Sequence, residues 1–170
     1  MRAVQLLAIL SAMAYADPLE GASWRMTAVG PEPHGIRALD GSDGVTAVTE
    51  RGGAPCLTTA PNAAPPSRYL YFDVDAANPG RPLYLVVEYY GGGLGGSISV
   101  EYDSALGDAL PDAYRRSERQ WGGWFIGEQA WKKGVFLLEK PRFAGRQNLG
   151  ADFRLSGSPL LVRSVALSLE

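Results

Sequence analysis

The stretch from Arg68 to Asp103 constrains the fold more than any other part of the chain. Its three segments rich in Tyr, Phe, Val, Leu and Ile are separated by an Asn-Pro-Gly turn at 78–80 and a glycine-rich stretch at 91–96. Such residues favour strands, whereas Gly and Pro end strands and turn the chain. In the third segment Ile98, Val100 and Tyr102 alternate with polar residues, as in a strand with one buried face. We therefore expect three antiparallel neighbouring strands of an all-β domain.

The rest of the chain has the same character. Further strands are expected at 24–29, 45–50, 55–59, 132–139, 151–155 and 160–169, and the turns between them are rich in Gly and Pro. No segment has a sustained helical period. Eight or nine short strands predict an antiparallel β-sandwich, with a jelly roll as the expected topology.

The N-terminal residues 1–16 have the pattern of a secretory signal peptide. Arg2 precedes an apolar run, and the segment ends in Ala14-Tyr15-Ala16, small enough around the cleavage site for signal peptidase. The run is shorter than the ~20 residues that span a membrane. We therefore expect a secreted or extracytoplasmic protein without a membrane span, in which residues 17–170 form a single domain.

Charge and cysteine content exclude several classes of partner and site. The chain has 16 basic and 18 acidic residues and no basic patch, which argues against nucleic acid and anionic membranes as partners. Cys56 is the only cysteine, so it is either a buried small hydrophobe or a reactive thiol, and its place in a predicted strand favours burial. His34 is the only histidine and cannot form a multi-histidine metal site.

Four segments resemble a known family. They are YLYFDVD at 69–75, LYLVVEYYGGGLGGSISVEYDS at 83–104, AWKKGVFLLEKPRFAGRQNLGADFRL at 130–155 and the final VRSVALSLE. Together they are similar to the galactose-binding-domain-like jelly rolls of bacterial secreted proteins, a group that includes many carbohydrate-binding modules. The resemblance covers roughly 68–170 and implies a jelly-roll fold and sugar binding. The chain departs from the family pattern at Tyr90, where three glycines follow in place of an acidic residue.

An aromatic and polar cluster is the first candidate site. Sugar rings have apolar faces that stack on indoles, and their hydroxyls need polar partners. The residues that combine these properties, and the predicted ligand-binding set, are Tyr114, Arg119, Gln120, Trp121 and Trp124. The alternative is that the aromatics only pack, as we expect for Trp131, which we place in the core.

Two carboxylates form the second candidate. If 91–96 centres a hairpin, Glu88 and Glu101 are diagonal neighbours on one face, roughly 7–8 Å apart at the backbone. This spacing suits a glycosidase acid pair. The alternative, which we favour, is a solvated face whose acids pair with Arg154 or Lys133. Because DFRL alternates, we expect Asp152 and Arg154 opposite the core, with Arg154 as a structural ion partner of Glu88 or Glu101.

Asp40 and Asp43 in DGSDG form a third, weaker candidate, for a structural calcium ion. The alternative is an ordinary Asp-Gly turn. No other cofactor is expected.

Three functions are consistent with these patterns. The first is a secreted non-catalytic module that binds polysaccharide through exposed aromatics. The second is a small jelly-roll glycoside hydrolase using Glu88 and Glu101, and the third a structural or adhesion domain of a surface assembly. The sequence leaves open the sugar, the place of the site and the oligomeric state.

Overall fold

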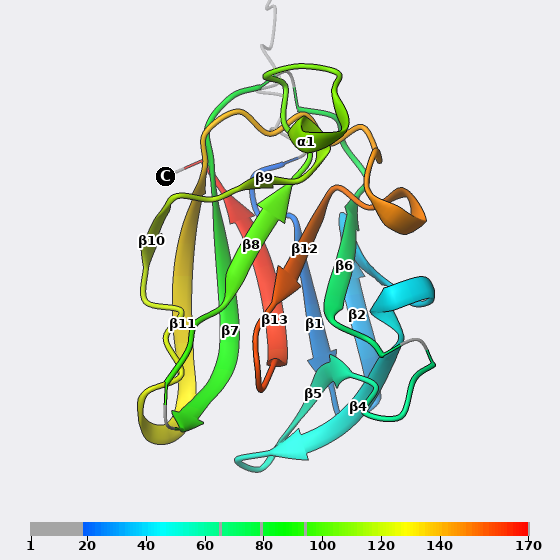
Figure 1. The fold of residues 1–170 in the computed structure, drawn as a ribbon. Helices are drawn as coiled ribbons and strands as arrows, with labels where there is room; N and C mark the ends of the chain where they lie inside the picture. Colours follow the sequence, from blue (N-terminus) through cyan, green and yellow to red (C-terminus); the bar gives the residue numbers. More distant parts are fainter. Residues whose placement is uncertain (1–18, 65, 79, 94, 170) are drawn as a thin grey trace, which may run out of the picture.

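The computed structural model describes residues 19–64, 66–78, 80–93 and 95–169. This part of the chain folds into two antiparallel sheets that face each other (Figure 1). The expected all-β sandwich is therefore confirmed. The predicted signal peptide, residues 1–16, lies outside the described residues.

The larger sheet has eight strands in the order β10-β11-β7-β13-β1-β2, with β5 also paired to β13 and β4 paired to β5. Its strands are β1 (Ser23–Thr27), β2 (Gly30–His34), β4 (Thr46–Arg51), β5 (Ala54–Thr59), β7 (Leu83–Gly93), β10 (Arg119–Trp121), β11 (Gly127–Leu138) and β13 (Leu161–Ser168).

The smaller sheet has five strands in the order β3-β6-β12-β8-β9. They are β3 (Ile36–Leu39), β6 (Tyr69–Val74), β8 (Ser99–Tyr102), β9 (Arg115–Arg116) and β12 (Phe153–Ser156). The short helical elements are the 3₁₀ turns η1 (Ser42–Gly44) and η2 (Asn148–Gly150) and the helix α1 (Leu110–Ala113). No helix in the described part of the chain is long and apolar enough to cross a membrane.

The core lies between the sheets and joins them through aromatic rings. The Trp24 ring of β1 meets Phe72 of β6 edge-on, with 5.6 Å between centroids, and Phe72 stacks on Phe153 of β12 at 5.1 Å. All three side chains are buried. Ring packing of this kind adds to the stabilisation from burial alone, so these residues tie the two sheets into one unit.

The three strands of the 68–103 stretch are not neighbours, contrary to the sequence prediction. β7 lies between β11 and β13 in the larger sheet, while β6 and β8 belong to the smaller sheet and both pair with β12. The glycine-rich stretch therefore connects one sheet to the other and does not close a hairpin. Alternation identifies the buried face of a strand, but it does not identify the strand's partner.

β2 contains Pro31 and Pro33, and proline is rare inside strands because it cannot donate to the ladder. It pairs only with β1 and so lies at the edge of the sheet. Residues two apart in a strand direct their backbone nitrogens to the same side, so both prolines can face the unpaired edge, where no donor is needed.

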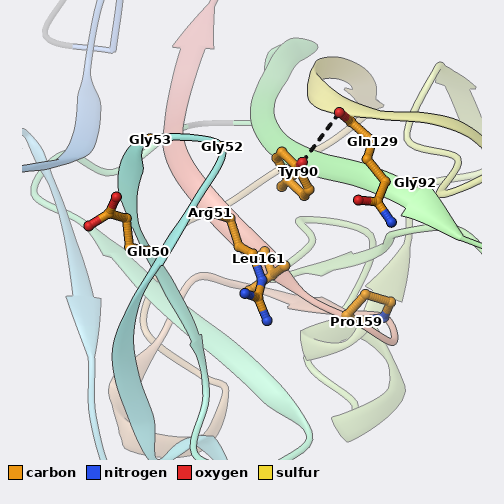
Figure 2. A pocket seen from close by; sticks show the side chains of 9 residues that line it. All are labelled: Glu50, Arg51, Gly52, Gly53, Tyr90, Gly92, Gln129, Pro159 and Leu161. Carbon is orange, nitrogen blue, oxygen red and sulfur yellow. Dashed lines mark hydrogen bonds between the residues drawn. The ribbon is translucent and has the colours of Figure 1, made fainter.

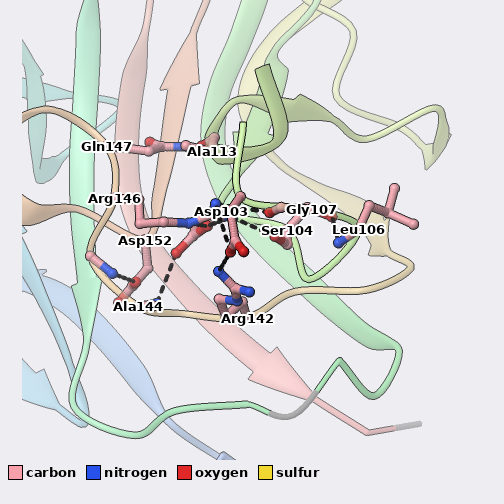
Figure 3. Close-up of polar contacts among 12 residues, drawn as sticks. Asp103, Ser104, Leu106, Gly107, Ala113, Arg142, Ala144, Arg146, Gln147 and Asp152 are labelled. Carbon is pink, nitrogen blue, oxygen red and sulfur yellow. Dashed lines mark hydrogen bonds and ion pairs between the residues drawn. The ribbon is translucent and has the colours of Figure 1, made fainter. Parts of the chain in front are cut away.

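A buried polar network holds the loops at one end of the sandwich (Figure 3). Asp103 is fully buried and accepts hydrogen bonds from the Ala144 nitrogen at 2.8 Å and from Arg146 Nε at 2.7 Å. Asp152 accepts from the nitrogens of Val74 at 2.9 Å and Gly145 at 2.7 Å. The predicted placement of Asp152 on the outer face is wrong, because these backbone donors draw its carboxylate inward.

Candidate functional site

The outer face of the larger sheet carries the candidate site, and strand alternation decides which side chains it presents. On β7 the buried and half-buried positions alternate, so Leu85 and Val87 face the core while Tyr84, Val86 and Glu88 face outward. The register then sets outward residues of β11 directly opposite those of β7. These cross-strand pairs are Leu137 with Tyr84, Val135 with Val86, Lys133 with Glu88, and Trp131 with Tyr90.

Trp121 forms one edge of this face. It lies on β10 opposite Val135, and it is 54% exposed. Its ring centroid is 6.2 Å from that of Tyr84. Ala166 of β13 lies opposite Val86. These apolar side chains lie side by side across four strands, and we call the set the apolar row. Its members are Trp121, Val135, Val86 and Ala166.

A polar row lies beside the apolar row and contains Lys133, Glu88 and Ser164. Arg163 donates two hydrogen bonds to the Glu88 carboxylate, one from Nε at 2.9 Å and one from Nη2. Ser164 Oγ donates a third at 3.2 Å. These hydrogen bonds, chiefly those from Arg163, lower the pKa of Glu88. Glu88 is therefore held ionised as an acceptor, in a fixed orientation.

Trp131 belongs to this outer face and not to the core, so its predicted core placement is wrong. It is half-buried, its ring meets Tyr90 edge-on at 5.4 Å, and the Arg163 guanidinium lies 4.5 Å from its centroid. The turn of the β4–β5 hairpin covers both rings. A Cβ on Gly52 would lie 2.7 Å from the Tyr90 ring, so only glycine allows this approach.

The same hairpin borders this end of the face and forms one wall of a cleft (Figure 2). The cleft volume is about 490 Å³, within the ~300–1,000 Å³ typical of ligand sites. Its lining residues are Glu50, Arg51, Gly52, Gly53, Tyr90, Gly92, Gln129, Pro159 and Leu161. The Tyr90 hydroxyl donates to the Gln129 carbonyl at 3.3 Å, which links the neighbouring strands β7 and β11 at the cleft.

The predicted ligand-binding residues do not form one cluster. Trp124 is 50% exposed but bridges to Ser97, in the segment that leads to β8 of the other sheet. Its carbonyl accepts the Tyr89 hydroxyl at 2.8 Å. Trp121 and Trp124 therefore belong to different parts of the surface, because the chain leaves the larger sheet after β10.

Arg119 and Gln120 flank Trp121 on β10. Arg119 lies 3.8 Å from Glu139 and is mostly exposed. Gln120 lies opposite the buried Phe136, and its side-chain nitrogen donates to the Gly122 carbonyl at 3.3 Å. Arg119 can reach a ligand at the edge of the face, whereas Gln120 supports the turn that follows Trp121.

Tyr114 lies on the outer face of the smaller sheet, away from the other predicted residues. Its ring centroid lies 4.3 Å from the Arg154 guanidinium, and that of Tyr69 lies 3.8 Å from the same group. Arg154 Nε donates to Glu101 at 2.6 Å. The predicted ion pair between Arg154 and Glu101 is therefore confirmed.

Glu88 and Glu101 are on different sheets, so the predicted diagonal pair does not exist. Each carboxylate is paired with its own arginine, Glu88 with Arg163 and Glu101 with Arg154. A retaining or inverting glycosidase needs two carboxyl groups flanking one bond. The geometry that motivated the hydrolase alternative is absent.

Asp40 and Asp43 serve hydrogen bonds within the fold. Asp40 accepts from the nitrogen and hydroxyl of Thr46 at 2.6 and 2.8 Å. Asp43 accepts from the Tyr71 hydroxyl at 3.1 Å and from Asn148 Nδ2 at 3.2 Å. Within the described ranges no group of three or more His, Cys, Asp or Glu residues could hold a metal ion. Calcium at these aspartates stays a prediction.

The described ranges also place Cys56, which is buried as predicted. The site residues that the sequence did not indicate are Tyr84, Val86, Ser164, Arg163 and Arg51. Tyr84 could have been found from the period of β7, whereas Arg51 carries no local signal. Comparisons with known protein families, with curated protein sequences and with solved structures gave no match.

Proposed function

We propose that this protein is a secreted, non-catalytic carbohydrate-binding domain with the galactose-binding-like variant of the jelly roll. The observation that carries the proposal is an exposed Trp121, beside Tyr84, at the end of an apolar row that is flanked by oriented polar groups. The C–H face of a sugar stacks on such rings, and its hydroxyls bond to neighbouring polar side chains.

The polar groups of the face are already oriented. Glu88 is ionised and held by Arg163 and Ser164, so it can accept from a sugar hydroxyl without reorganising. Lys133 lies opposite Glu88 and is exposed, so it supplies a donor. Groups that are rigid before binding lose less entropy on binding, which favours affinity.

The dimensions of the face favour a polysaccharide chain over a single sugar. The apolar row crosses the three strand spacings from β10 to β13. At ~4.8 Å each these span about 14 Å, which is longer than one sugar ring. We therefore assign the face to several consecutive residues of one chain.

Affinity gel electrophoresis tests this function. The probes are soluble xylan, mixed-linkage β-glucan and polygalacturonate. Binding slows migration in at least one gel, and Trp121→Ala abolishes the retardation while its melting temperature stays near that of the parent. Trp124→Ala is the matched control, because its indole is equally exposed but lies elsewhere.

Three results would contradict the proposal. Free migration of the parent protein in every polysaccharide gel would exclude glycan binding of this kind. Loss of binding in Trp124→Ala but not in Trp121→Ala would move the site to the segment between β10 and β11, where Trp124 bridges to Ser97. Association of the parent into symmetric oligomers through Trp121, without any glycan ligand, would instead favour a structural or adhesion role.

A further inference from the structure

The cleft under the β4–β5 hairpin contains a cation without a partner. Arg51 ends β4 and is exposed, and no acidic side chain among the described residues forms an ion pair with its guanidinium. Glu50 precedes it and also lines the cleft, but its side chain points away from that of Arg51, on the other side of the hairpin (Figure 2). This follows from the alternation of side chains along a strand. Arg51 is therefore the charged side chain of the hairpin that points into the cleft, toward Leu161.

The remaining lining gives the cleft the character of a sugar subsite. Gln129 is exposed and reaches in from the wall formed by β11 (Figure 2). Leu161 and Pro159 supply an apolar surface, and Gly52, Gly53 and Gly92 add no side chains that would fill the space. A planar guanidinium binds a carboxylate with two parallel hydrogen bonds. One uncompensated arginine suits a ligand group of one negative charge.

The cleft adjoins the sheet face at Tyr90. Tyr90 lines the cleft and lies on β7 two residues beyond Glu88, next to the Trp131 that contacts Arg163. The apolar row crosses β7 at Val86, and a ligand that also extends along β7 from there, past Glu88 to Tyr90, reaches the cleft at the hairpin. The positive charges of Lys133 and Arg51 lie along that path.

We propose that this cleft binds the carboxylate-bearing residue of an acidic polysaccharide, with Arg51 as the partner of the uronate carboxylate and Gln129 as a hydroxyl partner. The inference rests on the proposed glycan-binding function and narrows its ligand to uronic-acid polymers. It does not require the carboxylates of the ligand to contact Trp121.

The test compares acidic oligosaccharides with carboxyl-reduced forms of the same chains by isothermal titration calorimetry. The probes are oligogalacturonate, oligoguluronate and oligomannuronate. Arg51→Met removes the charge and keeps the aliphatic stem. Arg68→Met is the matched control, because Arg68 is exposed and precedes β6 of the other sheet. The expected result is a Kd for the best acidic probe raised about tenfold or more in Arg51→Met, the loss typical of a charge-assisted hydrogen-bond pair.

Arg51→Met should leave the Kd of the carboxyl-reduced probe within about twofold, and Arg68→Met should change neither Kd. Equal effects of Arg51→Met on both probes, or no effect, overturn the acidic subsite. If Trp121→Ala still lowers the affinity for both probes, the proposed glycan-binding function stands without the acidic subsite. If the parent protein binds only neutral glycans, the acidic subsite is wrong but the proposed glycan-binding function stands. Failure of every acidic and neutral probe to bind overturns both.

Discussion

Truncation of Arg154 is the sharpest test of how the smaller sheet is stabilised. Its side chain is only 14% exposed, and that of its partner Glu101 is 27% exposed. In Arg154→Ala the Glu101 carboxylate loses its cation, while Tyr69 and Tyr114 lose the guanidinium between them. The change therefore removes an ion pair, a hydrogen bond to the Tyr71 hydroxyl at 3.1 Å and the ring contacts with Tyr69 and Tyr114 at one point.

The size of the effect follows from these contacts. A hydrogen bond to a charged group contributes ~1.5–3 kcal/mol. Each cation–π contact adds ~0.5–1 kcal/mol, and solvent screening of the partly exposed pair reduces the total. We expect a loss of about 3 kcal/mol in the free energy of unfolding. For a domain of this size, that lowers Tm by roughly 6–12 °C.

Thermal and urea unfolding followed by circular dichroism measure this loss. The control is Arg115→Ala, because Arg115 and Glu118 form a pair at 3.5 Å whose side chains are 42% and 74% exposed. Such surface pairs contribute ~0–1 kcal/mol. The Arg154→Ala protein should also keep its glycan affinity, because Arg154 lies on the opposite sheet. The reasoning is wrong if Arg154→Ala is no less stable than Arg115→Ala, or if a normally stable Arg154→Ala protein loses glycan binding.

Three further predictions concern other parts of the fold. Burial, with the nearby Asp73 carboxylate, raises the pKa of Asp152 to about 7, against ~4 for an unfolded aspartate. Its stabilising contribution is therefore complete below pH ~4 and is lost as the pH rises through about 7, so urea unfolding should show the parent losing stability relative to Asp152→Asn over that window. A difference in unfolding free energy between the parent and Asp152→Asn that stays constant over this pH window would contradict the prediction. Burial also raises the pKa of the Cys56 thiol, so Ellman's reagent should react with it at pH 8 only after the protein unfolds; rapid reaction of the native protein would show an accessible thiol. Gly52→Ala should lower Tm more than Gly53→Ala, since both glycines have positive φ but only a Cβ on Gly52 would meet the Tyr90 ring. Equal losses would mean that the hairpin does not lie on that ring.

The strands could be predicted from the sequence because burial of one face leaves a period of two. β8 and the residue before it are an example, since Ile98, Val100 and Tyr102 are buried as the alternation indicated. The same alternation in DFRL correctly predicted the contact between Arg154 and Glu101. The partner strands of β7 and of β8 could not be predicted, because a glycine-rich connection allows either a hairpin or a crossing to the other sheet.

The site was predictable only in part. Trp121 could be found because an indole flanked by polar residues and glycines is unusual in a core. The sequence could not show that Trp124 lies on another part of the surface than Trp121, because their separation depends on where the chain leaves the larger sheet. Arg51 and Gly52 belong to the site only because β5 pairs with β13, which brings the hairpin over Tyr90. Such long-range pairing has no local signature.

The central claim is that a glycan chain lies on the outer face of the larger sheet against Trp121. The most direct test is a ¹⁵N–¹H spectrum of the four tryptophan indoles, titrated with oligosaccharides of the polysaccharide that is retained best in the affinity gels. The indole signal of Trp121 should shift until saturation, while the signals of the buried Trp24 and of Trp124 stay in place. Saturable binding that shifts Trp124 and leaves Trp121 unmoved would contradict the account.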